Sequence, residues 1–159
     1  MHQINGKPVQ FQERGLFVSA HYLGNQVGRI KSHDKGDGTV LLGDVEVDER
    51  VEIWNGRLAR FIRRFHPDRG VVFPRKQRIG TELLKRFMQA CERKGVREIF
   101  GNVTHEADRS QPFLRGWYEG FGFVVCPPDG RDEWFPIKYK VIWKRREGRL
   151  PYFDGSDPL

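Results

Sequence analysis

The stretch from Ile79 to Lys94 constrains the fold most, because its apolar side chains recur with the period of an α-helix. Residues three and four positions apart share one face of a helix, and polar residues fill the other positions here. Gly95 follows, which suits the left-handed conformation in which many helices end. The stretch therefore predicts an amphipathic helix whose apolar face is formed by Ile79, Leu83, Leu84, Phe87, Ala90 and Cys91.

A short basic loop, residues 75–78, leads into this helix. Gly80 and Thr81 are small, so the backbone amides of the first turn can face a ligand. The first N–H groups of a helix have no partner within it, and the helix dipole places positive charge at the same end. The sequence therefore predicts a phosphate site here. A basic turn in front of a solvated helix is the plain alternative.

The same residues resemble the pyrophosphate loop, R/Q-x-x-G-x-G/A, of the GNAT superfamily of acyl-CoA-dependent N-acyltransferases. One position departs from the pattern, because Arg78 stands where the family most often has its first glycine. The resemblance implies that acetyl-CoA is the acyl donor and that its pyrophosphate is bound by Arg75, Gln77, Arg78, Ile79, Gly80 and Thr81.

A second motif lies downstream, where Tyr118 is followed four positions later by Gly122 and Phe123. This spacing is similar to the helix-to-strand signature of the same family, and together the two motifs cover about half of the chain. The resemblance favours Tyr118 as a general acid, because a phenol with a pKa of about 10 stays protonated near neutrality. A core tyrosine packed beside Trp117 is the alternative.

Two strands frame the predicted helix. Residues 39–47 are apolar and β-branched with alternating polarity, and residues 96–103 form a second strand. The resemblance implies an α/β (α+β) fold, with a mixed, mostly antiparallel sheet flanked by helices. It also implies that these two parallel strands splay apart, so that backbone groups near Val45 and Val47 pair with pantetheine. Glu46 is the expected general base, and Asp44, His105 and Glu106 remain open as alternatives.

The remaining elements are shorter. Strands at 17–22 and 27–30 are expected to form a hairpin across Gly24-Asn25, followed by a polar loop at 31–38. Residues 104–111 are expected to be a loop, with Ser110 capping a helix that has Pro112 in its first turn. Strands are expected at 123–126 and 137–143. One domain would span residues 1–143, followed by a polar tail at 144–159.

The family usually has two helices between its first two strands, but residues 4–39 show no helical period. The acceptor-binding wall must then come from elsewhere, and residues 48–74 are the candidate. Within them, apolar residues have helical spacing and arginines fill the remaining surface, although a strand at 58–65 is left open. The apolar residues are Trp54, Leu58, Phe61, Ile62 and Phe65, and the arginines are Arg57, Arg60, Arg63 and Arg64.

Composition narrows the partners. A net charge of +7 favours an anionic partner, which could be nucleic acid, an acidic membrane surface or a phosphate-bearing cofactor such as coenzyme A. Cys91 and Cys126 lack the spacing of a disulfide framework or zinc site, so buried thiols and no metal are expected. No signal peptide or membrane-length apolar run is seen, so we expect a cytoplasmic protein with no membrane partner.

The sequence thus predicts an N-acetyltransferase that moves an acetyl or short acyl group to a primary amine by direct attack in a ternary complex. The acceptor would be a small molecule or a protein, and a homodimer is left open. Two alternatives stand beside this prediction. One is a nucleic-acid-binding module built on residues 57–64 with Trp54, and the other is a coenzyme A-binding fold without turnover.

Overall fold

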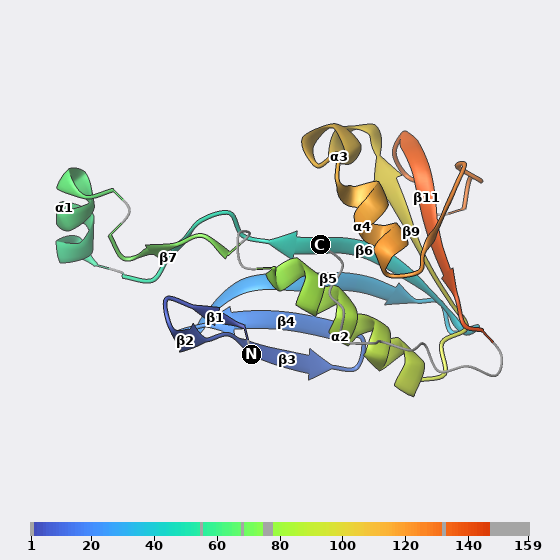
Figure 1. Ribbon diagram of the computed structural model, residues 1–159, viewed down its shortest axis with the longest axis horizontal. Helices are drawn as coiled ribbons and strands as arrows, with labels where there is room; N and C mark the ends of the chain where they lie inside the picture. Colours follow the sequence, from blue (N-terminus) through green and yellow to red (C-terminus); the bar gives the residue numbers. More distant parts are fainter. Residues whose placement is uncertain (1, 55, 68, 75–77, 132, 147–159) are drawn as a thin grey trace. The chain divides into compact units, whose positions relative to one another are not determined.

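The computed structural model describes residues 2–54, 56–67, 69–74, 78–131 and 133–146 (Figure 1). Seven strands form one sheet in the order β10-β11-β9-β6-β5-β4-β3, in which β6 and β9 are the parallel pair. The chain divides into two compact units, residues 1–31 with 44–90 and residues 32–43 with 91–159. Within the described residues, every helix is too short or too polar to span a bilayer.

The first unit begins with strands only. Short strands β1 (Gln3–Ile4) and β2 (Lys7–Pro8) pair with each other, and β3 (Gln10–Arg14) pairs with β4 (Phe17–Tyr22). The Tyr22 hydroxyl donates to the Ile4 carbonyl at 2.9 Å, which ties β1 to β4. Residues 4–39, all of them described, contain no helix, so the expected departure from the two-helix arrangement is confirmed.

The predicted hairpin is confirmed, with two corrections. Strand β5 (Asn25–Asp34) pairs antiparallel with β4, and Tyr22 lies opposite Asn25, so the turn is Leu23-Gly24 rather than Gly24-Asn25. Both turn residues have positive φ, 49° and 81°, as a two-residue hairpin turn of this kind requires. Strand β5 also continues to Asp34, through the first half of the expected loop at 31–38, where polar side chains give no alternation signal.

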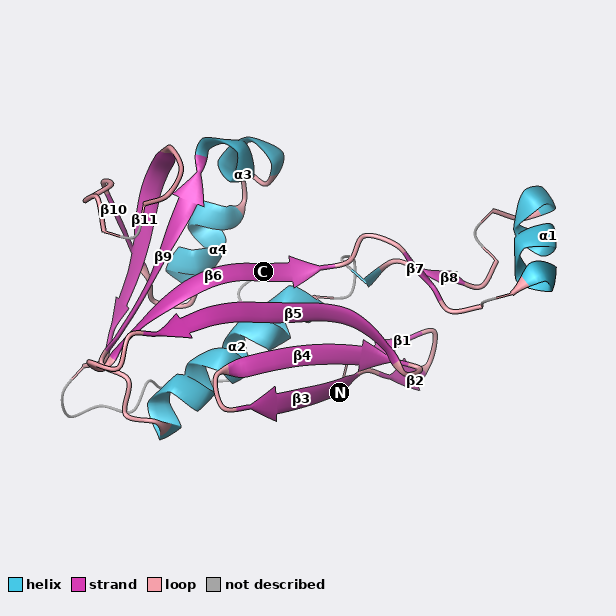
Figure 2. Ribbon diagram, turned by 180° about the vertical axis from the view of Figure 1, so that it is seen from behind, coloured by secondary structure: helices cyan, strands magenta, loops and turns pink. Residues whose placement is uncertain are grey.

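Helix α2 (Ile79–Arg93) is the predicted amphipathic helix, and it lies across the face of β4 and β5 in Figure 2. Its apolar face is fully buried, at 0% exposure for Leu83, Leu84 and Phe87. The helix approaches β5 closely at Gly28, where an added Cβ would lie 3.0 Å from Leu83 Cδ1. The helix ends as predicted, because Gly95 has a φ of 74° and its N–H donates to the Glu92 carbonyl.

Between β6 (Thr39–Val47) and α2 the chain makes an excursion. Strands β7 (Val51–Glu52) and β8 (Val71–Val72) pair antiparallel, and helix α1 (Arg57–Phe65) lies between them in sequence (Figure 1). The helical alternative for this segment is therefore confirmed, and a strand at 58–65 is wrong.

The second unit contains β9 (Glu98–Thr104), α3 (His105–Ser110), α4 (Leu114–Gly120), β10 (Val124–Cys126) and β11 (Ile137–Lys144). Strand β11 pairs antiparallel with both β9 and β10. The predicted strands are therefore confirmed, with ends shifted by one or two residues. Cys91 is buried as expected, whereas Cys126 is only half-buried, and both thiols are free.

Two expectations between β9 and α4 are wrong. Residues 105–110 form α3 rather than a loop, because the Thr104 hydroxyl accepts from the Ala107 N–H at 3.1 Å and caps the helix. Ser110 does not cap the next helix, since it closes α3 and donates to the Ala107 carbonyl at 3.2 Å. Helix α4 begins only at Leu114, after Phe113 in the N-cap position.

Candidate functional site

The amino end of α2 carries most of the predicted phosphate-binding residues that the structure describes. Ile79, Gly80 and Thr81 form its first turn, where N–H groups have no partner within the helix. Arg75 and Gln77 lie outside the described residues. Arg78 precedes the helix with a φ of 55°, and its carbonyl accepts from the Glu82 N–H at 3.3 Å. An arginine therefore holds the left-handed backbone that glycine adopts without strain, at the position where the sequence pattern departs.

Gly80 places this helix end against the end of β6. An added Cβ would lie 3.4 Å from Val47 Cγ2 and 3.8 Å from Val45 Cγ1, so the first turn of α2 and the last residues of β6 are in close contact. Glycine at this position allows the helix end to approach β6 this closely. The structure thus brings together three of the residues predicted to bind the cofactor.

Strand β6 has nine residues, and four of them pair with β9. The parallel ladder runs from Thr39 opposite Glu98 to Leu42 opposite Gly101, and β6 continues beyond it as far as Val47. Backbone N–H and C=O groups need hydrogen-bond partners, and beyond Leu42 the parallel ladder with β9 no longer supplies them to β6. The carboxyl-terminal half of β6, which includes Val45 and Val47, therefore lies outside the parallel ladder.

Glu46 holds two cations. Its Oε1 accepts from Lys31 Nζ at 2.6 Å and its Oε2 accepts from Arg29 Nε at 2.5 Å. The hydrogen bond from Lys31, and then that from Arg29, keep the pKa of the Glu46 carboxyl below its ordinary value of 4.5. Glu46 is therefore ionised at neutral pH and is a weaker base than an unpaired glutamate.

Sequence reasoning missed both partners of Glu46. Arg29 lies in the expected strand at 27–30, and Lys31 lies in the expected loop at 31–38. The two residues are two positions apart on β5, so they share one face of the strand. That spacing was the available signal, although nothing in it identifies Glu46 as the partner.

The other candidate bases are exposed. Asp44 is exposed on β6, and His105 and Glu106 are exposed in the first turn of α3. Within the described residues, no group of three or more His, Cys, Asp or Glu side chains is placed to hold a metal ion.

Tyr118 lies in the last turn of α4 and is buried, at 8% exposure. The helix ends in a Schellman arrangement, in which the Phe123 N–H donates to the Tyr118 carbonyl at 3.2 Å and the Gly122 N–H donates to Glu119. Gly122 has the required positive φ, 84°. The Tyr118 ring packs edge-on against Phe123 at 5.5 Å. The spacing of Tyr118, Gly122 and Phe123 therefore ends helix α4.

A second buried phenol lies in the same unit. Tyr139, on β11, is 7% exposed, and burial, followed by the charge of Asp108, raises the pKa of its hydroxyl. The carboxylate of Asp108 is itself held by Lys138. Tyr139 is therefore a natural reference for Tyr118, because the two tyrosines are equally buried.

The fold is similar to those of solved acetyltransferases. A GNAT-family acetyltransferase from Staphylococcus aureus Mu50 is 15% identical, with a TM-score of 0.50 over 80% of this chain and 66% of that one. A putative GNAT acetyltransferase from Desulfovibrio desulfuricans is 18% identical, with a TM-score of 0.51 over 80% and 67%. The PaiA N-acetyltransferase from Thermoplasma acidophilum, solved in complex with coenzyme A, is 17% identical, with a TM-score of 0.50 over 82% and 60%.

No protein-family model and no curated protein matches the sequence. The likeness spans less than two thirds of the Staphylococcus and Thermoplasma chains. At these identities it concerns the fold, and it confirms the mixed, mostly antiparallel architecture with one parallel pair and flanking helices that the two motifs imply.

Proposed function

We propose that this chain, whose fold is that of the GNAT N-acetyltransferases, transfers an acetyl or other short acyl group from acetyl-CoA to a primary amine. The acceptor would be an amine-bearing small molecule or protein. Transfer would occur by direct attack in a ternary complex, without an acylated protein intermediate.

The observation that carries this proposal is the contact of Gly80 with the end of β6, 3.4 Å from Val47 Cγ2. The positive end of α2 suits a diphosphate, and the adjoining backbone of β6 suits the amides of pantetheine. Both groups occur in coenzyme A in that order. Arg78, exposed in front of the helix, adds positive charge on the same side of the first turn.

The chemistry requires a nucleophile, a stabilised oxyanion and a proton for the leaving group. The amine nitrogen attacks the thioester carbonyl, the carbon–sulfur bond breaks, and the thiolate leaves with a proton from a general acid. We assign that acid to Tyr118, a buried phenol held by the helix end and by Phe123. A backbone amide of β6 would polarise the carbonyl, and holding the two substrates together lowers the barrier by several kcal/mol.

The proton that leaves the amine needs an acceptor, and Glu46 is the proposed one, acting through water. Its two cationic partners lower its basicity, so its contribution is expected to be smaller than that of Tyr118.

Calorimetry with acetyl-CoA tests the donor site. Gly80→Asp places a carboxylate at the helix end, so the Kd for acetyl-CoA should rise at least about tenfold through charge repulsion. An acidic residue in the first turn favours the helix, but its side chain would lie against Val45 and Val47, so the Tm is measured beside the Kd. Gly80→Ala is the matched control, since its Cβ makes ordinary contacts at 3.4 and 3.8 Å. Equal affinity in the two variants would contradict the site.

Turnover is tested by mass spectrometry of an amine library incubated with the protein and acetyl-CoA. Tyr118→Phe should lower kcat on any acceptor found by about 10²–10⁴-fold, the usual contribution of general acid–base catalysis. Tyr139→Phe removes an equally buried hydroxyl and should leave kcat nearly unchanged. Binding of acetyl-CoA with no product from any amine would instead favour a coenzyme A-binding fold without turnover.

A further inference from the structure

Helix α1 turns its apolar side to solvent. Leu58 is 72% exposed, Phe61 62% and Phe65 66%, and their spacing of three and four residues places them on one face. The two phenylalanine rings pack edge-on at 5.5 Å, and Leu58 precedes Phe61 by one turn on the same face. We call Leu58, Phe61 and Phe65 the apolar strip.

The opposite side of α1 attaches the helix to the segment of chain that connects β6 to α2. Ala59 is buried, and the guanidinium of Arg63 donates to the Trp54 carbonyl at 2.9 Å. Arg63 also pairs with Glu52 of β7 at 2.9 Å, and its side chain is only 11% exposed. Helix α1 is therefore anchored through a small residue and an arginine, which leaves the apolar strip uncovered.

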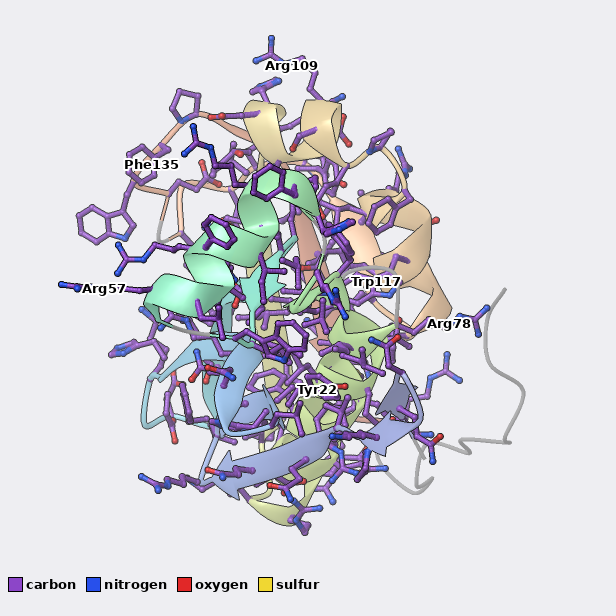
Figure 3. All side chains as sticks on the ribbon, turned by 90° about the vertical axis from the view of Figure 1, so that its left-hand side faces the viewer. Tyr22, Arg57, Arg78, Arg109, Trp117 and Phe135 are labelled. Atoms are coloured by element: carbon purple, nitrogen blue, oxygen red, sulfur yellow. The ribbon has the colours of Figure 1, made fainter. Side chains whose placement is uncertain are left out.

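A basic strip runs beside the apolar one. Arg57, Arg60 and Arg64 are exposed, and their side chains make no hydrogen bond or ion pair with any residue in the described ranges. At 100° per residue they occupy the arc next to Phe61. Figure 3 shows the Arg57 side chain extending from the helix away from the ribbon. The first turn of α1 contains no acidic residue, so these charges are not balanced locally.

We propose that α1 binds reversibly to the surface of an anionic lipid bilayer, with the apolar strip inserted and the basic strip at the phosphates. A short helix with Phe and Leu on one side and arginines on the other is the form of an interfacial membrane helix. Guanidinium groups bind phosphate with two hydrogen bonds, and each basic residue near an anionic surface adds to the attraction.

The size of the patch favours lipid over protein. Aromatic side chains present about 150–250 Å², so exposures of 62–72% leave roughly 400 Å² of apolar surface on the three residues. A stable protein interface needs about 800 Å² from each partner. Insertion into a bilayer has no such minimum, since each buried side chain contributes by itself.

Nucleic acid fits the patch less well. Single-stranded nucleic acid binds through bases that stack on open aromatic faces. In α1 the two rings lie against each other, and Leu58 offers no stacking surface. The expectation of no membrane partner rested on the absence of a spanning run, which a helix lying on the surface does not need.

Flotation of the full chain with lipid vesicles tests the proposal. Vesicles of phosphatidylcholine alone are compared with vesicles of equal parts phosphatidylcholine and phosphatidylglycerol. The protein should float with the anionic vesicles only, and a rise in salt should weaken binding, because the attraction to the headgroups is screened. Failure to bind the anionic vesicles at low salt would overturn the proposal.

Two triple variants separate the contributions of the strips. Leu58→Ser/Phe61→Ser/Phe65→Ser should weaken partitioning into anionic vesicles at least about tenfold. Arg57→Gln/Arg60→Gln/Arg64→Gln should weaken it roughly a hundredfold. All six side chains are exposed, so the circular dichroism spectrum and the Tm of both variants should change little.

Matched controls exist elsewhere in the chain. Trp134→Ser/Phe135→Ser removes two aromatic side chains that are 82% and 73% exposed, and it should leave binding unchanged. Lys7→Gln/Arg14→Gln/Arg109→Gln removes the same net charge as the arginine variant, and it should weaken binding far less. Equal losses in the controls would overturn the proposal, because binding would then depend on overall charge. Tighter binding to a single-stranded oligonucleotide, or a dimer that the serine variant dissociates, would also overturn it.

Discussion

Helices α1 and α2 have the same kind of sequence and opposite surroundings. Both carry apolar residues three and four positions apart with arginines between them. In α2 the apolar face is buried, with Leu83 and Phe87 at 0% exposure, whereas in α1 Leu58 and Phe61 are 72% and 62% exposed. The difference lies in the covering element, because β4 and β5 lie under α2, whereas α1 is held to the β7–β8 segment through Arg63.

The contrast shows that forming an amphipathic helix and covering its apolar face are separate questions. A helical period predicts that a segment can form a helix with one apolar face. It does not predict that the face is covered, since that depends on strands far away in the sequence. A covered face stabilises the fold, and an uncovered one is available to a partner.

Thiol labelling should give the largest difference between the two helices. Burial raises the pKa of the Cys91 thiol in α2 to about 12, so labelling requires unfolding. In a Cys126→Ser background, native Cys91 should react with maleimide more than about a thousandfold slower than the thiol introduced by Leu58→Cys in α1. Comparable rates would show that the α2 face is not closed.

Truncation of one phenylalanine in each helix should show the same contrast in stability. Phe87→Ala opens a cavity under α2 and should lower the free energy of unfolding by about 3–5 kcal/mol. Phe61→Ala in α1 should change it by no more than about 0.5 kcal/mol. Urea unfolding measures both, and a large loss for Phe61→Ala would mean that α1 packs against something.

The close approach of α2 to β5 gives a smaller effect. Gly28→Ala would place a Cβ 3.0 Å from both Leu83 Cδ1 and the Glu46 carbonyl, so we expect a loss of about 1–3 kcal/mol. Gly116→Ala in α4 meets nothing within 4 Å and should stabilise the protein by about 0.5–1 kcal/mol. Urea unfolding of the two variants should therefore give opposite signs.

The smallest effect concerns the ion pairs of Glu46, beside the amino end of α2. Its pKa is lowered in the folded state, so its stabilising effect is present above its unfolded value of 4.5 and is lost as the pH falls through the folded value. Glu46→Gln should cost less than about 1 kcal/mol at neutral pH, because the group is partly exposed.

In urea unfolding this cost should shrink as the pH falls below the unfolded value of 4.5 and through the lower folded value. It should also vanish at neutral pH in an Arg29→Gln/Lys31→Gln background, which removes both cations. A cost that stays constant with pH in the native background would rule out the ion pairs as its source.

Much of the fold could be predicted from the sequence, because long periodic segments carry strong signals. The hairpin, β6, α2 and β9 follow from alternation or a helical period. Helix α3 was missed because six residues are too few for a period and its cap, Thr104, lies at a strand end. The sequence does not predict the extension of β5 past Ile30, because the last four residues of the strand are polar and carry no apolar alternation.

The candidate site shows the same division. The small residues of the first α2 turn and the Tyr118 spacing are local patterns, and both could be read from neighbouring residues. The positive φ of Arg78 and the two cations on Glu46 could not, because each depends on the path of the backbone or on side chains from another strand.

By itself, the order of residues determined that the longer helices and strands form and which side of each is apolar, because those preferences act over a few neighbouring residues. Only the tertiary structure decided which apolar faces are covered, that an arginine holds a left-handed backbone before α2, and that the Glu46 carboxylate is paired with two cations. These outcomes depend on groups far apart in the chain, and folding alone brings such groups within a few ångströms of each other.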